Sequence, residues 1–440
     1  MGPVEMELRR RAEARGLDVG SSLPDDATSW VAYLLTRDRG NTQMRQAPLT
    51  AGCGHSMFVD TEGRLLLSGH AVDPAAVERR EIGAPTPVPS MQNRRIVAVA
   101  CSDNHSLALS AVGGVYSWGD GRYGELGLGD RVARAVPCRI ESLSRIESIT
   151  AGPHLTSAAV DESGKLFTWG RAAYSFADEK EEEVEETGAS NGLGHEMDAE
   201  TEWQLTPKRV EALLHERVAG VALGHGFTLA VTDAGAVFSF GYSADGELGH
   251  GSLASVVLPR RIEILTQKGQ RFVAVTAGIR HVLALTEQGE LFGWGHEEAN
   301  GHWTEAAHLG EGHYERTPHR LASFVGKRVK LVVARKYSSC AVTAKGELFT
   351  WGLSRAGSLG HGCGGPYIEP KRVEGLSGVK VAAVAIGASH MLAADEDGVV
   401  WAFGQHLNFG LDASGPAAAT APVLTPTPIP TLRVRVVNSP

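Results

Sequence analysis

One stretch of the sequence is rich in histidine, the side chain that most often binds metal ions. It contains, in chain order, His296, Glu297, Glu298, His302, Glu305, His308, Glu311, His313 and His319. Imidazole and carboxylate groups are zinc ligands, but metal sites usually space them one helical turn apart or closely within a loop. The histidines here are five or six residues apart. We therefore expect a polar loop that binds no metal, so that the protein retains no zinc after gel filtration in chelator.

The sequence offers little other evidence of a reaction centre. It has no Gly-x-x-x-x-Gly-Lys loop that would cradle a phosphate, and its five cysteines form no Cys-x-x-Cys pair. The odd number and wide spacing of the cysteines favour a reducing compartment. A catalytic triad assembled from distant residues is the remaining alternative. We expect a protein without catalytic residues and without a cofactor.

The net charge of the chain disfavours binding to nucleic acid. The chain carries a net charge of −9 at pH 7, whereas contact with phosphates needs clustered Lys and Arg. Three basic pairs nevertheless recur at one position of the repeat described next, at Lys208-Arg209, Arg260-Arg261 and Lys371-Arg372. We expect these pairs to be solvated residues that protect sheet edges, and the alternative is that they contact an acidic partner.

The elements that position these residues follow from a glycine pattern that occurs seven times. A glycine is followed six residues later by a second glycine, at Gly63/Gly69, Gly113/Gly119, Gly164/Gly170, Gly235/Gly241, Gly289/Gly295, Gly346/Gly352 and Gly398/Gly404. An aromatic residue precedes the second glycine in six copies, and a basic residue lies 18 or 19 residues before the first glycine in all seven. The second glycines are 50 to 71 residues apart, so the chain is one unit repeated seven times.

Each copy contains four short segments whose apolar residues alternate as in a half-buried strand. In the second copy these segments are Ile96 to Ala100, Ser106 to Ser110, Val115 to Trp118 and Pro137 to Ile140. Four strands make one blade of a β-propeller, and propellers have about four to eight blades. The sequence therefore predicts an all-β fold, a seven-bladed β-propeller with four-stranded blades.

The repeat resembles that of the regulator of chromosome condensation (RCC1) family over about nine tenths of the chain. The family pattern has four parts, which are a His-Ser pair, a hairpin that ends in Trp-Gly, a Gly-x-Leu-Gly loop and a Pro-x-x-Val segment. In this sequence they occur at His55-Ser56, Gly113 to Gly119, Gly124 to Gly127 and Pro207 to Val210. The resemblance implies a propeller of RCC1 type.

The histidine of this pattern is not present in every copy. It occurs at His55, His105, His281 and His390, and the other copies have Thr156, Phe227 and Ser338 instead. Because phenylalanine can replace it, we expect the histidine to have a packing role.

We expect the propeller to cover residues 45–440, with a short and partly helical N-terminal extension at 1–44. An insertion at about 171–200 contains the acidic run Asp178 to Glu186, which we expect to be a solvated loop. The alternative is that it masks or binds a basic surface. The C-terminal residues Leu432 to Val437 begin an eighth repeat and should complete the first blade, whose own first strand contains Pro48.

The sequence gives no sign of membrane insertion or secretion. No stretch reaches the about 18 apolar residues of a membrane span, and the N-terminus lacks the apolar core of a secretory signal. We expect a monomer in the cytoplasm or the nucleus.

The resemblance implies that the propeller binds a protein partner, and we expect a protein-interaction scaffold without chemistry of its own. The alternative is a guanine-nucleotide exchange factor for a Ran-like small GTPase, an activity of the family's founding members. The loops after the second glycines vary between copies while their frame is constant, and such loops usually carry function. The candidate partner-binding residues in these loops are Asp120, Arg122, Tyr123, Tyr242, Asp245 and Arg355.

Overall fold

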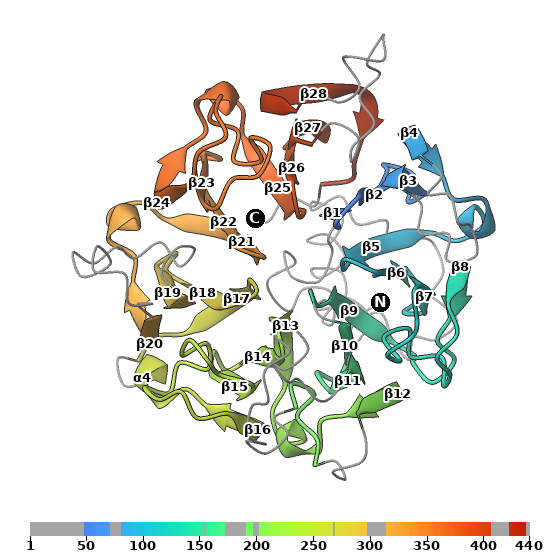
Figure 1. Ribbon diagram of the computed structural model, residues 1–440, viewed down its shortest axis with the longest axis vertical. Coiled ribbons are helices and arrows are strands. Elements are labelled where there is room, and N and C mark those ends of the chain that lie inside the picture. Colours follow the sequence, from blue (N-terminus) through green and yellow to red (C-terminus); the bar gives the residue numbers. More distant parts are fainter. Residues whose placement is uncertain are drawn as a thin grey trace, which may run out of the picture.

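The computed structural model shows seven β-sheets arranged around a central axis (Figure 1). It describes residues 48–70, 81–153, 155–171, 191–196, 202–266, 269–296, 314–405 and 422–436. The extension at 1–44, the acidic run at 178–186 and most of the His-rich stretch lie outside these ranges. The predicted all-β, seven-bladed propeller of four-stranded blades is confirmed.

In every blade, four antiparallel strands follow one another from the centre to the rim in chain order (Figure 1). Blades 1 to 3 consist of β1 (Leu49–Ala51), β2 (His55–Val59), β3 (Leu65–His70) and β4 (Glu81–Pro87); β5 (Ile96–Cys101), β6 (His105–Ser110), β7 (Val115–Gly119) and β8 (Arg134–Arg139); and β9 (Ile146–Ala151), β10 (Thr156–Asp161), β11 (Leu166–Arg171) and β12 (Trp203–Arg209). The four strands predicted in the second copy thus match β5 to β8 within a few residues.

Blades 4 to 7 repeat this arrangement. They consist of β13 (Val218–Leu223), β14 (Phe227–Thr232), β15 (Val237–Gly241) and β16 (Val256–Arg261); β17 (Phe272–Ala277), β18 (His281–Thr286), β19 (Leu291–His296) and β20 (Tyr314–Arg320); β21 (Val329–Arg335), β22 (Ser338–Thr343), β23 (Leu348–Gly352) and β24 (Tyr367–Arg372); and β25 (Val381–Ile386), β26 (His390–Asp395), β27 (Val399–Gly404) and β28 (Val423–Arg433). Short helical turns follow the outer strands at η1 (Pro89–Met91), η3 (Glu211–Leu213), α4 (Glu263–Thr266), η5 (Ala322–Phe324) and η6 (Glu374–Leu376).

The two glycines of each repeat are required by close backbone contacts. Gly113 has a φ of 78° in the turn between β6 and β7, and a Cβ atom there would lie 2.8 Å from the Cα of Arg145, the basic residue that begins the next repeat. Gly119 ends β7 with a φ of 123°, and a Cβ atom would lie 2.4 Å from the carbonyl oxygen of Asn104. Glycine adopts a positive φ without steric cost, and no other side chain fits these spaces.

The hydrophobic core lies between the blades. The buried apolar side chains of the described residues form seven clusters, and each cluster joins two neighbouring blades. The aromatic residue before the second glycine belongs to this packing. Trp169 of blade 3 is fully buried against Gly127 of blade 2, and its Nε1–H donates a hydrogen bond to the carbonyl oxygen of Glu125 at 2.9 Å. The repeated aromatic positions thus stabilise the ring rather than form a binding site.

The repeated histidines also connect neighbouring blades. Each is buried, and its Nε2 makes a hydrogen bond with a serine Oγ of the following blade. The pairs are His55 with Ser106 at 3.0 Å, His105 with Ser157 at 2.7 Å, His281 with Ser339 at 2.7 Å and His390 with Ser56 at 2.8 Å. Burial lowers the pKa of His105, His281 and His390 to about 3, so these rings are neutral at physiological pH. The predicted packing role is confirmed.

The ring is closed by contacts between the two ends of the chain. Val434 donates its N–H to the Gly398 carbonyl, as Ile96 does to that of Gly63, and it forms a β-bridge with Asp60 of blade 1. The tail therefore begins the inner strand of blade 1, which β1 continues, as predicted. The predicted span was wrong, however, because Leu432 and Arg433 belong to β28 and extend the rim strand of blade 7. Val437 lies outside the described residues.

Candidate partner-binding face

One face of the ring carries the candidate loops. Each second glycine pairs with the first residue of the second strand of its blade, as Gly119 does with His105 and Gly352 with Ser338. The loops that follow the glycines therefore leave the sheet on the same side as the turns between the first and second strands. We call this side the loop face. Because the second glycines occupy the same position in every repeat, the chain leaves all seven sheets at a common rim.

In blade 2 the loop holds three of the candidates together. Asp120 accepts hydrogen bonds from Arg122, whose Nε lies 2.7 Å from Oδ1, and 70% of the Arg122 side chain is exposed. Tyr123 is half-buried, and the guanidinium carbon of Arg171 lies 5.5 Å from the centre of its ring. Arg122 and Tyr123 are thus accessible side chains held by charged neighbours.

In blades 4 and 6 the candidates differ in exposure. Tyr242 is half-buried, and burial raises the pKa of its hydroxyl. Asp245 is only 5% exposed and lies 3.5 Å from the Nη1 of Arg280 in blade 5, so it connects two blades. Arg355 is exposed. Because blades 2, 4 and 6 alternate around the ring with other blades (Figure 1), the candidates share one face but not one continuous patch.

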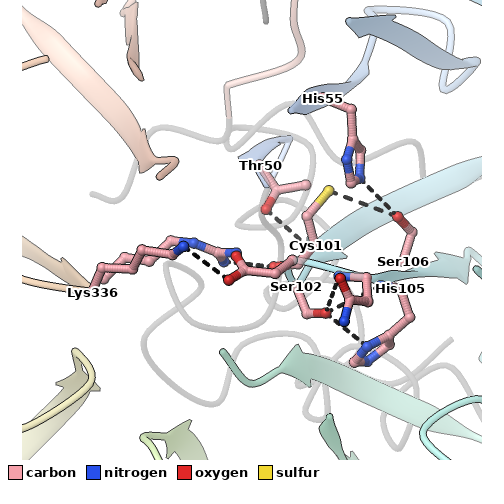
Figure 2. A network of polar contacts seen from close by, with 10 residues as sticks. Thr50, His55, Cys101, Ser102, His105, Ser106 and Lys336 are labelled. Carbon is pink, nitrogen blue, oxygen red and sulfur yellow. Dashed lines mark hydrogen bonds and ion pairs between the residues drawn. The ribbon is translucent and has the colours of Figure 1, made fainter. Parts of the chain in front are cut away.

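An ion pair crosses the centre of the loop face. Asp103 follows β5, and its two carboxylate oxygens lie 3.1 Å from Arg335 Nη2 and 2.9 Å from Lys336 Nζ, both of blade 6 on the opposite side of the ring. Figure 2 shows Lys336 extending across to the turn that contains Ser102. Burial raises the pKa of Asp103, but the two positive charges outweigh that effect and hold its pKa below the ordinary value.

This ion pair lies at one end of the central channel. The channel has a volume of about 270 Å³ and is lined by the first strands of all seven blades, mostly through alanine, valine and leucine side chains. Arg335 also donates from Nη1 to the carbonyl oxygen of Cys101 at 2.6 Å. No sequence pattern indicated this contact, because the two residues are more than 230 positions apart.

Two buried carboxyl groups support the loops of blades 2 and 4. Glu125 and Glu247 are the second residues of Gly-Glu-Leu-Gly segments, and the Oε2 of each accepts a backbone hydrogen bond at 2.8 Å, from Tyr123 and Asp245 respectively. Their exposed fractions are 0% and 2%. Burial raises the pKa of both groups to about 7. The charges that act on them are Asp120 and Arg122 at Glu125, and Asp245 and Arg280 at Glu247.

These two groups predict a pH dependence of stability near neutrality. Their pKa values are higher in the folded protein than in the unfolded chain, so their contribution is complete below about pH 4.5 and is lost as the pH rises through about 7. We expect the stability of a variant with Glu125→Gln and Glu247→Gln to rise relative to that of the wild type between about pH 4.5 and pH 7, and the difference to level off at higher pH. Urea midpoints of both proteins across this range provide the measurement, and a constant difference would contradict the assignment.

Three further residues on the loop face were not identified from the sequence. Arg131 of blade 2 lies over the ring of Trp203 of blade 3, with 4.0 Å from its guanidinium carbon to the ring centre. Arg171, the residue after the second glycine of blade 3, pairs across strands with Trp203. The position of Arg171 next to a second glycine was the one available signal.

Nowhere in the described ranges do three His, Cys, Asp or Glu side chains converge in a way that could hold a metal ion. The described helices are also too short or too polar to cross a bilayer.

Comparisons with known proteins identify the repeat. A family model described as the regulator of chromosome condensation (RCC1) repeat matches residues 112–159, 234–285 and 345–394, and a second model of the same description matches 96–125 and 272–301. The chain is 31% identical to the RCC1 domain-containing protein RUG3, mitochondrial, of Arabidopsis thaliana over 329 residues, covering 72% of this chain and 68% of that protein.

Other similarities concern parts of larger proteins or the fold alone. The chain is 34% identical to the E3 ubiquitin-protein ligase HERC2 of Homo sapiens over 80% of its own length, but this match spans only 7% of the ligase. The crystal structure of Prp20p from Saccharomyces cerevisiae superimposes with a TM-score of 0.67 at 19% identity, covering 90% of this chain and 89% of that one. Prp20p is described as binding Gsp1p and histones.

Proposed function

The chain belongs to the RCC1 repeat family, and on that premise we propose that it is a protein-interaction scaffold that binds a protein partner through its loop face. The proposal rests on one observation, which is that the packing of the blades is constant while the loops after the second glycines vary. Seven buried interfaces fix the blades, while the chain leaves every sheet on one side after the second glycine and continues in loops whose sequences differ between blades. Function usually resides in variable loops on such a rigid scaffold.

The exposed side chains of these loops support binding rather than chemistry. Arg122, Tyr123, Tyr242 and Arg355 are exposed or half-buried, and Tyr and Arg are enriched among residues that dominate interface energies. The buried histidines and Glu125 contact neighbouring backbone and side chains within the ring. We further propose that residues 45–440 form the propeller unit, that 1–44 are an extension, and that the protein acts as a monomer in the cytoplasm or the nucleus.

The scaffold proposal predicts loss of partner capture when the loop anchors are truncated. We expect a variant with Arg122, Tyr123, Tyr242 and Arg355 all changed to Ala to lose its main partner, because each anchor typically contributes about 2 kcal/mol or more, roughly thirtyfold in affinity. Affinity purification from the native cell identifies the partner, and binding of the purified proteins measures the loss.

The matched control removes charge elsewhere on the surface. Arg260 and Arg261 are exposed on the rim strand of blade 4, and their replacement by Ala should leave capture unchanged. The melting temperature of the loop variant should stay within a few degrees of the wild type. If capture survives the loop changes but is lost when residues 178–186 are deleted, the acidic insertion is the recognition surface and the loop-face proposal is wrong.

A narrower form of the proposal is guanine-nucleotide exchange on a Ran-like small GTPase. It is supported by the fold shared with Prp20p, which is described as binding Gsp1p. An exchange factor holds the nucleotide-free GTPase most tightly, so capture of a GTPase should increase when nucleotide is depleted from the lysate. Capture that does not respond to nucleotide would favour a scaffold without exchange activity.

A further inference from the structure

A polar network at one end of the central channel joins the turns between the first and second strands of four blades. His225 in blade 4 donates its backbone N–H to the carbonyl oxygen of Ile279 in blade 5 at 3.3 Å, and Ile279 donates its own to that of Lys336 in blade 6 at 2.8 Å. From blade 6, the side chains of Arg335 and Lys336 reach the carboxylate of Asp103 in blade 2 at 3.1 and 2.9 Å (Figure 2). We call these residues the axial network.

The arginine that crosses the channel is specific to blade 6. Glycine occupies the position of Arg335 in most other blades, at Gly52, Gly152, Gly224, Gly278 and Gly387. In blade 5, for example, a Cβ atom on Gly278 would overlap the ring of the repeated histidine, His281. Blade 6 has Ser338 instead of the histidine, which leaves room for the side chain of Arg335. Two departures from the repeat thus act together to place a guanidinium at the channel.

The charged members of the network are shielded from solvent. The side chain of Arg335 is 11% exposed, and those of Asp103 and Lys336 are each 26% exposed. Water and salt screen such a pair weakly, and removal of one partner leaves a charge that is buried without compensation. Loss of the Asp103 carboxylate should therefore disturb blade 6 as well as blade 2.

The same turns also hold the three loops that carry the candidate residues. Each of these loops begins with a backbone N–H that donates to the carbonyl oxygen of the residue directly after a member of the axial network. The pairs are Asp120 with Asn104 at 3.0 Å in blade 2, Tyr242 with Gly226 at 2.8 Å in blade 4 and Leu353 with Tyr337 at 2.9 Å in blade 6. The three loops are therefore linked through the axial network, although their blades are not neighbours.

We propose that the axial network holds the loops of blades 2, 4 and 6 in fixed relative positions, so that Asp103, Arg335 and Lys336 act as positioning residues for partner binding. The inference rests on the proposed loop-face function and adds how three separate groups of side chains bind one partner together. Loops that are already ordered lose less conformational entropy on binding, so the affinity of the whole face is higher. The order of one loop then depends on that of another, and such coupling is reciprocal.

Hydrogen exchange measures this coupling without knowledge of the partner. In the variant Asp103→Asn, we expect the amide of Leu353 in blade 6 to exchange about tenfold faster than in the wild type. In the reciprocal variant Lys336→Met, the amide of Asp120 in blade 2 should exchange faster by a similar factor. The double variant should exchange no faster than the faster single variant, because both changes interrupt the same link.

Two further variants separate positioning from general destabilisation. Asp103→Glu keeps the charge and should return the exchange of the Leu353 amide to near the wild-type rate. Glu162→Gln is the matched control, since it removes a carboxylate that lies 2.8 Å from Arg145 in the hairpin turn between β10 and β11, on the opposite face of the ring. This control should leave the exchange of the loop amides unchanged.

Binding of the partner found by affinity purification tests the positioning role itself. We expect Asp103→Asn to weaken this binding about tenfold, although it leaves the anchors Arg122, Tyr242 and Arg355 in place, and Asp103→Glu to restore most of the affinity. If Asp103→Asn does not fold, Lys336→Met keeps the pair of Asp103 with Arg335 and should weaken binding in the same direction.

Three results would overturn the proposal. Asp103→Asn could speed exchange at Asp120 alone and leave Leu353 at the wild-type rate, Glu162→Gln could change Leu353 as much, or both amides could respond while partner binding stays the same. Failure of the proposed function is a different outcome. If capture of the partner does not depend on the loop anchors, the loop-face proposal fails, even where hydrogen exchange shows that the loops are coupled.

Discussion

Alanine at Trp351 or at Trp118 is expected to lower the free energy of unfolding by about 3 to 5 kcal/mol, the usual effect of emptying a large buried aromatic site. Trp351 is fully buried between blades 5 and 6, with its ring centre 5.9 Å from that of Phe324. Trp118 is 5% exposed in the cluster between blades 1 and 2. Each cavity would open inside an interface between blades, where neighbouring strands cannot move to fill it.

Urea unfolding of the two variants measures this effect. Val112→Ala is the control, because Val112 is 82% exposed in a hairpin turn and its truncation should change stability by no more than about 0.5 kcal/mol. Unchanged urea midpoints for both tryptophan variants would mean that these residues do not stabilise the interfaces between the blades.

Removal of residues 430–440 is expected to destabilise the whole ring. Leu432 and Val434 are 3% and 1% exposed in the cluster between blades 7 and 1, and burial of each contributes about 1.5 to 3 kcal/mol. The truncation also removes the bridge from Val434 to Asp60 and exposes the edge of β2. Blade 1 would then be held to blade 7 by fewer contacts, such as the hydrogen bond between Ser56 and His390.

The loss should appear as a lower urea midpoint and as faster hydrogen exchange of the amides in β1 and β2. A second truncation that removes only residues 437–440 keeps Leu432 and Val434, and its midpoint should equal that of the full chain. If the longer truncation unfolds at the same urea concentration as the full chain, closure by the tail does not stabilise the ring.

The repeat frame could be predicted from the sequence because its causes are local. Gly113 and Gly119 occupy backbone positions with positive φ. The apolar and polar residues between them alternate, which predicts a strand that follows a tight turn. The same spacing recurs with every blade, so the number of blades, the order of their strands and the face of the loops all follow. Even the tail could be recognised, since Arg433 and Val434 repeat the start of a blade as Arg95 and Ile96 do.

The candidate site could be predicted only in part. The loop positions of Arg122 and Arg355 follow from the repeat, but the burial of Asp245 depends on Arg280 of the next blade. Arg131 and Trp203 meet because an outer strand of one blade packs beside a loop of another, and neither residue belongs to the repeated pattern.

The sequence by itself determined the fold, because glycine turns and strands with alternating apolar residues recur at the same positions of every repeat. The tertiary structure decided which side chains meet across blades: His105 with Ser157, Arg131 with Trp203, and Asp103 with Arg335. These contacts depend on the angle between neighbouring blades and on closure of the ring. That geometry is set by the packing of seven interfaces together, which no single repeat specifies.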